Sequence, residues 1–217
     1  MNGAWIILAA AMAATAAYAQ PDDLVCRNGD FPREQSRFGL AKVLGPERLN
    51  FLSDTDGCPS QAASCRQRAY VVAGDLLLTG RSHGAYVCAF FPGRGGGSAG
   101  WVPRERLAPA PAAASPPLTA WLGRWADGDD AIALSAKGAL LSADGEAYWP
   151  SAHTSRPGGP NLGELSGAAK PDGGRAVIGE ADGCQAVLTL VGDLLVVADN
   201  NGCGGMNVSF TGVYRRK

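Results

Sequence analysis

Short apolar runs, each ended by a turn that contains glycine, recur along most of the chain. In the first half they occupy residues 76–78 and 86–91, and a third run follows at 100–102. Runs of this length that are rich in β-branched and aromatic residues and are bounded by glycine are typical of strands. The pattern predicts a small β-barrel or sandwich in the first half.

The second half contains more runs of the same kind. They lie at residues 131–135, 138–143, 146–149, 161–165, 176–180, 184–191 and 194–199. With a terminal strand, about eight short strands are available in some 100 residues. This number predicts an antiparallel barrel or sandwich.

The last two of these runs predict a hairpin, because the turn pair Gly192-Asp193 separates them. A two-residue turn places Val191 opposite Leu194, and the same register brings Cys184 within two residues of Cys203. A small adjustment of the turn reaches the ~5.5–6 Å Cα separation that a disulfide needs. The register therefore predicts a Cys184–Cys203 disulfide.

Composition sets the broad class of the protein. The chain has 217 residues, of which 46% are hydrophobic and 18% charged, values that exclude a collagen-like, coiled-coil or wholly disordered protein. Its 19 basic and 20 acidic residues argue against a nucleic-acid-binding protein, which needs a basic excess to contact phosphates. We expect an all-β protein with two small β domains.

A proline- and alanine-rich segment at residues 108–118 predicts an extended linker between these domains. It separates a first domain at 20–107 from a second at 119–217. Residues 20–107 hold 11 basic and 9 acidic side chains, and residues 108–217 hold 8 and 11. The two halves therefore carry net charges of +2 and −3.

The first 19 residues are expected to form a signal peptide. An apolar run at residues 5–17 precedes Ala17-Tyr18-Ala19, a small-x-small site that predicts cleavage before Gln20. The run is shorter than the ~20 residues needed to span a bilayer. We expect a periplasmic or secreted protein, with no membrane span in the mature chain.

All six cysteines follow this predicted cleavage site, and an even number in an exported chain favours disulfides. Zinc sites usually contain close Cys-x-x-Cys pairs or histidines at fixed spacing, and neither pattern occurs here. We expect no metal and no cofactor. Four cysteines lie in the first half, so each half should close its own disulfides, and three connectivities remain open for Cys26, Cys58, Cys65 and Cys88. The short loop favours Cys58–Cys65.

The first half resembles a bacterial Src-homology-3-like domain over residues 50–107. The resemblance rests on the Gly74-Asp75 turn before a strand, the aromatic strand at 86–91 and the closing Gly100-Trp101-Val102 strand. It implies a five-stranded barrel that binds cell-wall glycan or peptide. The family's usual Asn-Val-Arg-Ser-Gly-Pro opening is replaced by residues 50–58, which end at a cysteine.

Four aromatic residues of this half are candidate ligand-binding residues, since exposed aromatic side chains often bind peptides or sugars. They are Tyr70, Tyr86, Phe90 and Trp101. The alternative is that they fill the core, because aromatic side chains supply much of the apolar area of a small β domain.

The edges of the second half carry two further resemblances. A Gly-x-Trp start at Gly123 and a Gly-x-Tyr end at Gly212 resemble small lipocalin-like barrels. Residues 203–214 are also similar to a tail of small exported bacterial proteins, some of which have lysozyme-inhibitor-type companions.

Motifs that suggest catalysis lack their structural context. Ser98 lies in a Gly-x-Ser-x-Gly sequence, but a strand follows it in place of the helix that a nucleophile elbow requires. His153 stands near Ser151 and Ser155 in a predicted loop, and His83 lies in a predicted hairpin turn. We expect no catalytic residue and no enzyme activity.

Two oxygen-rich segments, 127–130 and 199–202, suggest calcium ligands but lack EF-hand spacing. Aspartate, asparagine and glycine are ordinary turn residues, and we interpret both segments as turns.

These observations favour a non-enzymatic, secreted cell-envelope protein. Its Src-homology-3-like module would bind peptidoglycan or an envelope protein, and the second domain would be a disulfide-stabilised binding or scaffold unit. The alternative is a secreted inhibitor in which a rigid loop at 199–206 enters the active site of a lysozyme or protease.

Overall fold

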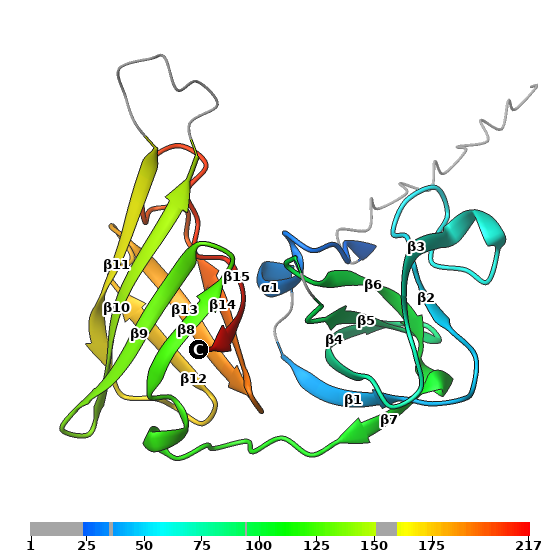
Figure 1. Cartoon of the computed structure of the whole chain (residues 1–217), viewed down its shortest axis with the longest axis horizontal. Coiled ribbons are helices and arrows are strands. Elements are labelled where there is room, and N and C mark those ends of the chain that lie inside the picture. The colour runs from blue at the N-terminus through cyan, green and yellow to red at the C-terminus, as the bar shows by residue number, and fades with distance from the viewer. Residues whose placement is uncertain (1–23, 35–36, 94, 151–159) are drawn as a thin grey trace, which may run out of the picture.

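The protein is all-β, with two sheets that lie side by side in the computed structural model (Figure 1). The structure describes residues 24–34, 37–93, 95–150 and 160–217. The predicted signal peptide and His153 lie outside these residues. Among the described residues, no helix is long and apolar enough to cross a membrane.

The first sheet has seven strands in the order β3-β2-β6-β5-β4-β1-β7, two more than the barrel that the resemblance implies. A four-residue helix, α1 (Phe31–Glu34), precedes them. The strands are β1 (Gly39–Val43), β2 (Leu49–Leu52), β3 (Arg66–Val71), β4 (Leu76–His83), β5 (Tyr86–Phe91), β6 (Ser98–Pro103) and β7 (Leu107–Ala110).

The second sheet is a nearly closed antiparallel barrel of eight strands in the order β11-β10-β9-β8-β15-β14-β13-β12. The strands are β8 (Gly123–Asp127), β9 (Asp130–Lys137), β10 (Leu140–Trp149), β11 (Asn161–Ala169), β12 (Arg175–Gly179), β13 (Gln185–Val191), β14 (Leu194–Asp199) and β15 (Gly212–Arg216). The predicted hairpin is confirmed, because Val191 pairs with Leu194.

The predicted strands at 138–143 and 146–149 are one strand, β10, which begins at Leu140. Its Gly145 faces the barrel interior, where an added Cβ would lie 2.9 Å from the Phe210 ring and 3.2 Å from Leu165. Glycine at this position lets the interior residues approach the backbone, so it marks close packing and not a turn.

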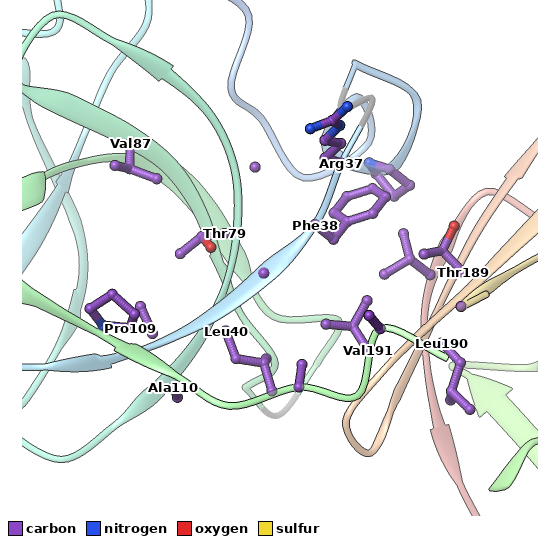
Figure 2. Close-up of a pocket in the computed structure, with 18 of the residues that line it drawn as sticks. Arg37, Phe38, Leu40, Thr79, Val87, Pro109, Ala110, Thr189, Leu190 and Val191 are labelled. Carbon is purple, nitrogen blue, oxygen red and sulfur yellow. The ribbon is translucent and has the colours of Figure 1, made fainter. Parts of the chain in front are cut away.

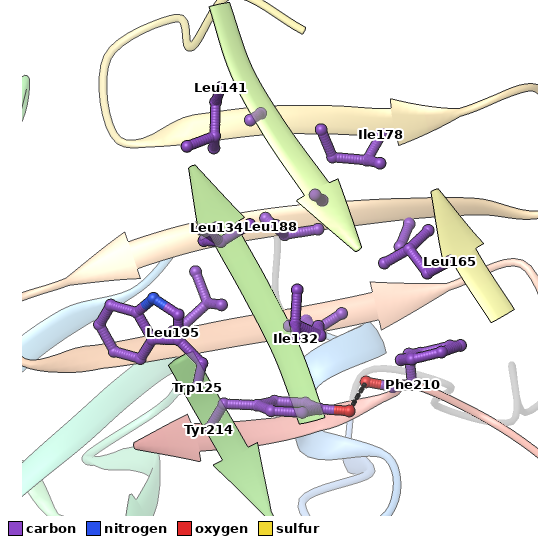
Figure 3. Packing of buried hydrophobic residues seen from close by; sticks show 14 of the residues in the cluster. Trp125, Ile132, Leu134, Leu141, Leu165, Ile178, Leu188, Leu195, Phe210 and Tyr214 are labelled. Atoms are coloured by element: carbon purple, nitrogen blue, oxygen red, sulfur yellow. Dashed lines mark hydrogen bonds between the residues drawn. The ribbon is translucent and has the colours of Figure 1, made fainter. Parts of the chain in front are cut away.

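Large side chains fill the barrel interior (Figure 3). Trp121, Trp125 and Tyr214 are fully buried there. The Tyr214 hydroxyl donates a hydrogen bond to the Phe210 carbonyl at 3.0 Å, and the Trp125 indole donates to the Trp121 carbonyl at 2.8 Å. Because their polar atoms have partners, Trp125 and Tyr214 add their apolar area without a desolvation penalty. The buried Trp121 indole nitrogen, by contrast, has no hydrogen-bond partner among the described residues.

All six cysteines form disulfides: Cys26–Cys88, Cys58–Cys65 and Cys184–Cys203. The pairing predicted from the hairpin is confirmed, and each disulfide stays within one half of the chain. Structural disulfides are typical of proteins that fold in an oxidising compartment. The three bridges therefore indicate a location outside the cytoplasm.

A shared apolar cluster joins the two halves. The outward-facing side chains of Val191, Val196 and Val213 on the barrel are buried in the same cluster as Phe31 and Leu40 of the first half. Two small domains joined by an extended linker, as the sequence predicts, would be expected to have separate cores. The difference arises because the strands β13 and β14 carry apolar side chains on both faces, and the second face requires a partner.

The linker is shorter than predicted. Residues 108–110 belong to β7, an edge strand that pairs with β1, and Pro109 is tolerated there because an edge strand has one unpaired side. At the other end, Leu118–Ala120 form a 3-10 helix. Between them the chain lies against the barrel, where an added Cβ on Gly173 would be 3.0 Å from the Ala114 carbonyl oxygen.

Removing the disulfides one at a time should reveal how much each loop stabilises the fold. The bridges close loops with sequence separations of 62, 19 and 7 residues. Replacing both cysteines by alanine should lower the unfolding free energy by about 4, 3 and 2 kcal/mol respectively in the loop-entropy model. Chemical denaturation measures these values, and an inverted order would contradict the expectation.

Candidate functional site

A cleft of about 1380 Å³ lies between the two halves. One wall is formed by β1, β4, β7 and the segment before β1. The other is formed by the outer face of β13 and β14 and the start of β12. In Figure 2, Phe38 and Leu40 on the first wall lie across from Thr189 and Val191 on the second.

The cleft lining is mainly aliphatic. Leu40 and Val87 on one wall and Val191 and Val196 on the other are buried, and hydroxyls are supplied by Thr79, Ser82 and Thr189. Small-molecule sites are usually apolar pockets of about 300–1,000 Å³ with a few polar groups. This cleft has the same character but is larger, so it has room for a segment of a polymer.

Four arginines line the cleft. Arg33 and Arg37 lie just before β1, Arg104 follows β6 and Arg175 begins β12. Among the described residues that line the cleft there is no aspartate or glutamate. The lining therefore attracts anions, although the whole chain has a formal net charge of only −1.

Arg33 connects the two halves. Its guanidinium contacts the Asp199 carboxylate at 2.6 Å and donates to Asn201 Oδ1 at 2.5 Å and Ser209 Oγ at 3.0 Å. The Asp199 side chain is completely buried, while that of Arg33 is one-third exposed. A single side chain of α1 thus binds three residues at one end of the barrel.

The protein surrounds the Asp199 carboxylate with donors. It accepts hydrogen bonds from the Phe210 amide at 2.8 Å and from the hydroxyls of Ser209 and Thr211 at 3.0 and 2.9 Å. Burial raises the pKa of Asp199, but the hydrogen bonds from Phe210, Arg33, Thr211 and Ser209 outweigh it, and the pKa is lowered from 3.8. Asp199 is therefore ionised at neutral pH.

Three of the four aromatic candidates, Tyr86, Phe90 and Trp101, belong to or pack against the shared apolar cluster, whereas Tyr70 lies apart, and none of the four lines the cleft. Trp101 and Phe90 are 0% and 4% exposed and belong to the shared apolar cluster, and the Trp101 indole donates to the Leu24 carbonyl at 2.9 Å. Their positions favour the core-filling alternative. Tyr86 on β5 is half-buried, and Tyr70 on β3 is exposed beneath the Arg48 guanidinium. The strands β2 and β6 separate the two tyrosines.

The other sequence candidates have structural roles or lie apart. Ser98 begins strand β6 opposite Phe91, and His83 is exposed at the end of β4. In the two oxygen-rich turns, Asp127 accepts from the Val213 amide and Asn200 from the Gln185 amide. Within the described part of the chain, no group of three or more potential metal ligands is found.

Asp130, in the first of these turns, accepts a hydrogen bond from the Tyr148 amide at 2.8 Å. Burial raises the pKa of both Asp127 and Asp130, and the backbone hydrogen bonds oppose this rise only in part. The two carboxylates hold the ends of strands in place.

Sequence reasoning missed the cleft. Two signals for it were present: β13 and β14 lack charged residues on their outer face, and two arginines lie within the six residues before β1. Neither signal says which surfaces meet, because the partner of an apolar outer face lies far away in the sequence.

Replacing Arg33 by glutamine should destabilise the protein. The Arg33→Gln variant loses charged hydrogen bonds to the buried Asp199, so the unfolding free energy should fall by about 1.5–3 kcal/mol. Arg27→Gln is a matched control, since Arg27 pairs with Asp54 from a side chain that is 55% exposed. The Arg27→Gln control should lower the unfolding free energy by less than about 1 kcal/mol. Equal losses of unfolding free energy for the two variants in denaturant titrations would contradict this role for Arg33.

The buried carboxylate should also make stability depend on pH. Because the pKa of Asp199 is lower in the folded than in the unfolded state, its contribution is present above the unfolded-state pKa and is lost as the pH falls through the folded-state value. Asp199→Asn should therefore lower stability at neutral pH and remove part of the acid-induced loss. Thermal melts from neutral to acidic pH test this, with Asp193→Asn in an exposed turn as the control.

Comparisons of the chain with protein-family models, curated proteins and solved structures find no match. Function is therefore inferred from the geometry of the cleft and the chemistry of its lining.

Proposed function

We propose that this is a non-enzymatic, exported binding protein of the cell envelope, and that its ligand, a cell-wall glycan or peptide, occupies the cleft between the two halves. The observation that carries the proposal is a wide cleft whose walls belong to different halves and are held together by buried contacts. Such a cleft keeps its shape without a ligand, so binding loses little conformational entropy.

Two further features support the proposal. The three disulfides fit a protein that works in the periplasm or after secretion. The apolar leader with its small-x-small site provides a route of export. The resemblance of residues 50–107 to a Src-homology-3-like domain suggests peptidoglycan as the polymer to test first.

Blocking the cleft should abolish binding to the cell wall. Thr189 lies on the cleft wall and is only partly exposed, so Thr189→Trp places a bulky side chain in the ligand's position. The variant should lose most of its retention on sedimented peptidoglycan. Thr119→Trp, at an exposed position in the 3-10 helix before the barrel, is the matched control and should bind like the unmodified protein.

Retention that survives Thr189→Trp, in a protein that melts normally, would contradict binding in the cleft. Absence of retention for the unmodified protein would contradict the choice of peptidoglycan as ligand.

The second candidate, a secreted inhibitor of a lysozyme or protease, is favoured by one observation. The loop after β14 is fixed at Cys203 by a disulfide and exposes 79% of Met206. A preorganised loop with an exposed apolar tip suits insertion into an active site. Near-stoichiometric inhibition of lysozyme that Met206→Ser abolishes and Thr189→Trp leaves intact would favour this candidate.

A further inference from the structure

Within the cleft, three arginines are available to bind a ligand. Arg33 is engaged with Asp199, whereas neither Arg37 nor Arg175 forms an ion pair with a described residue. Arg104 donates one hydrogen bond to the Gly84 carbonyl and keeps its other donors. Guanidinium groups bind carboxylates through two parallel hydrogen bonds, which gives both strength and orientation.

These charges come from both walls. Arg37 and Arg104 belong to the first half and Arg175 to the barrel, and the aliphatic side chains of Leu40, Val87 and Val191 belong to the same lining. A ligand that satisfies this arrangement has anionic groups and small apolar groups along one chain. An acidic peptide rich in alanine or similar residues has this chemistry.

We propose that the cleft recognises an acidic peptide, and that Arg37, Arg104 and Arg175 bind its carboxylates. The proposal rests on the function proposed above and specifies the charged part of the ligand. A nucleic acid is a poorer match, because proteins that bind it make about 6–10 phosphate contacts and these three guanidinium groups do not supply that number. The cleft volume of about 1380 Å³ gives room for several residues in an extended conformation.

The test compares two synthetic peptides, acetyl-(Ala-Glu)5-amide and acetyl-(Ala-Gln)5-amide, by calorimetric titration against the purified, disulfide-bonded protein. The glutamate peptide should bind at least about tenfold more tightly than the glutamine peptide at low salt. Salt should weaken its binding, because charges at the cleft mouth are screened. The glutamine peptide has the same backbone and length, so the difference isolates the carboxylates.

A double variant locates the site. Losing one exposed charge pair should weaken binding of the glutamate peptide roughly two- to fivefold. The effects of Arg37→Gln and Arg175→Gln should combine, so the double variant should bind about tenfold more weakly. The matched control is Arg66→Gln with Arg68→Gln, two exposed arginines of β3 outside the cleft that carry the same total charge. The control should change affinity less than about twofold.

Equal affinity for the two peptides, no binding of either, or an equal loss in both double variants would overturn the proposal. Tighter binding of a single-stranded oligonucleotide of the same charge would also overturn it. The experiments distinguish failure of the acidic-peptide proposal from failure of the proposed cell-wall binding. If peptidoglycan is retained and Thr189→Trp releases it while both peptides bind equally, the cleft binds cell wall without recognising carboxylates.

Discussion

The burial of the barrel's outer face against the first half is the constraint on which the rest of the structure depends. The strands β13 and β14 carry apolar side chains on both faces. One face lines the barrel interior, and the other would be exposed to water if the first half did not cover it. Burying each such side chain contributes about 1.5–3 kcal/mol relative to leaving it exposed. The two halves must therefore dock, and the cleft is the part of their boundary where side chains do not meet.

The Arg33–Asp199 contact orients this docking. Apolar surfaces attract without direction, so Val196 and Val213 alone leave the angle between the halves undetermined. A fully buried carboxylate that is already held by three other donors accepts a guanidinium in few geometries. Buried ion pairs often add little net stability because desolvation is costly, and specifying one arrangement is a role that fits Asp199.

The sequence predicted the all-β class, the hairpin around Gly192 and the Cys184–Cys203 disulfide, because each depends on residues that are close along the chain. It did not predict that residues 140–149 form one strand, because the reason is the contact of Gly145 with the distant Phe210 ring. Nor did it find the cleft. Arg37 and Arg175 are 138 positions apart (175 − 37), and the docked barrel face is what brings them into one lining.

The same docking determines the charge of the cleft. An ionised Asp199 at the edge of the cleft would ordinarily offset the positive potential of the arginines. The negative charge of the second half would likewise reduce the potential that the first half's net charge of +2 produces at their boundary. Here Arg33 and three uncharged donors enclose that carboxylate, and its side chain has no exposed surface. The neutralised pair leaves Arg37, Arg104 and Arg175 as the charges that a ligand meets, so the contact that fixes the angle between the halves also keeps their shared cleft positive.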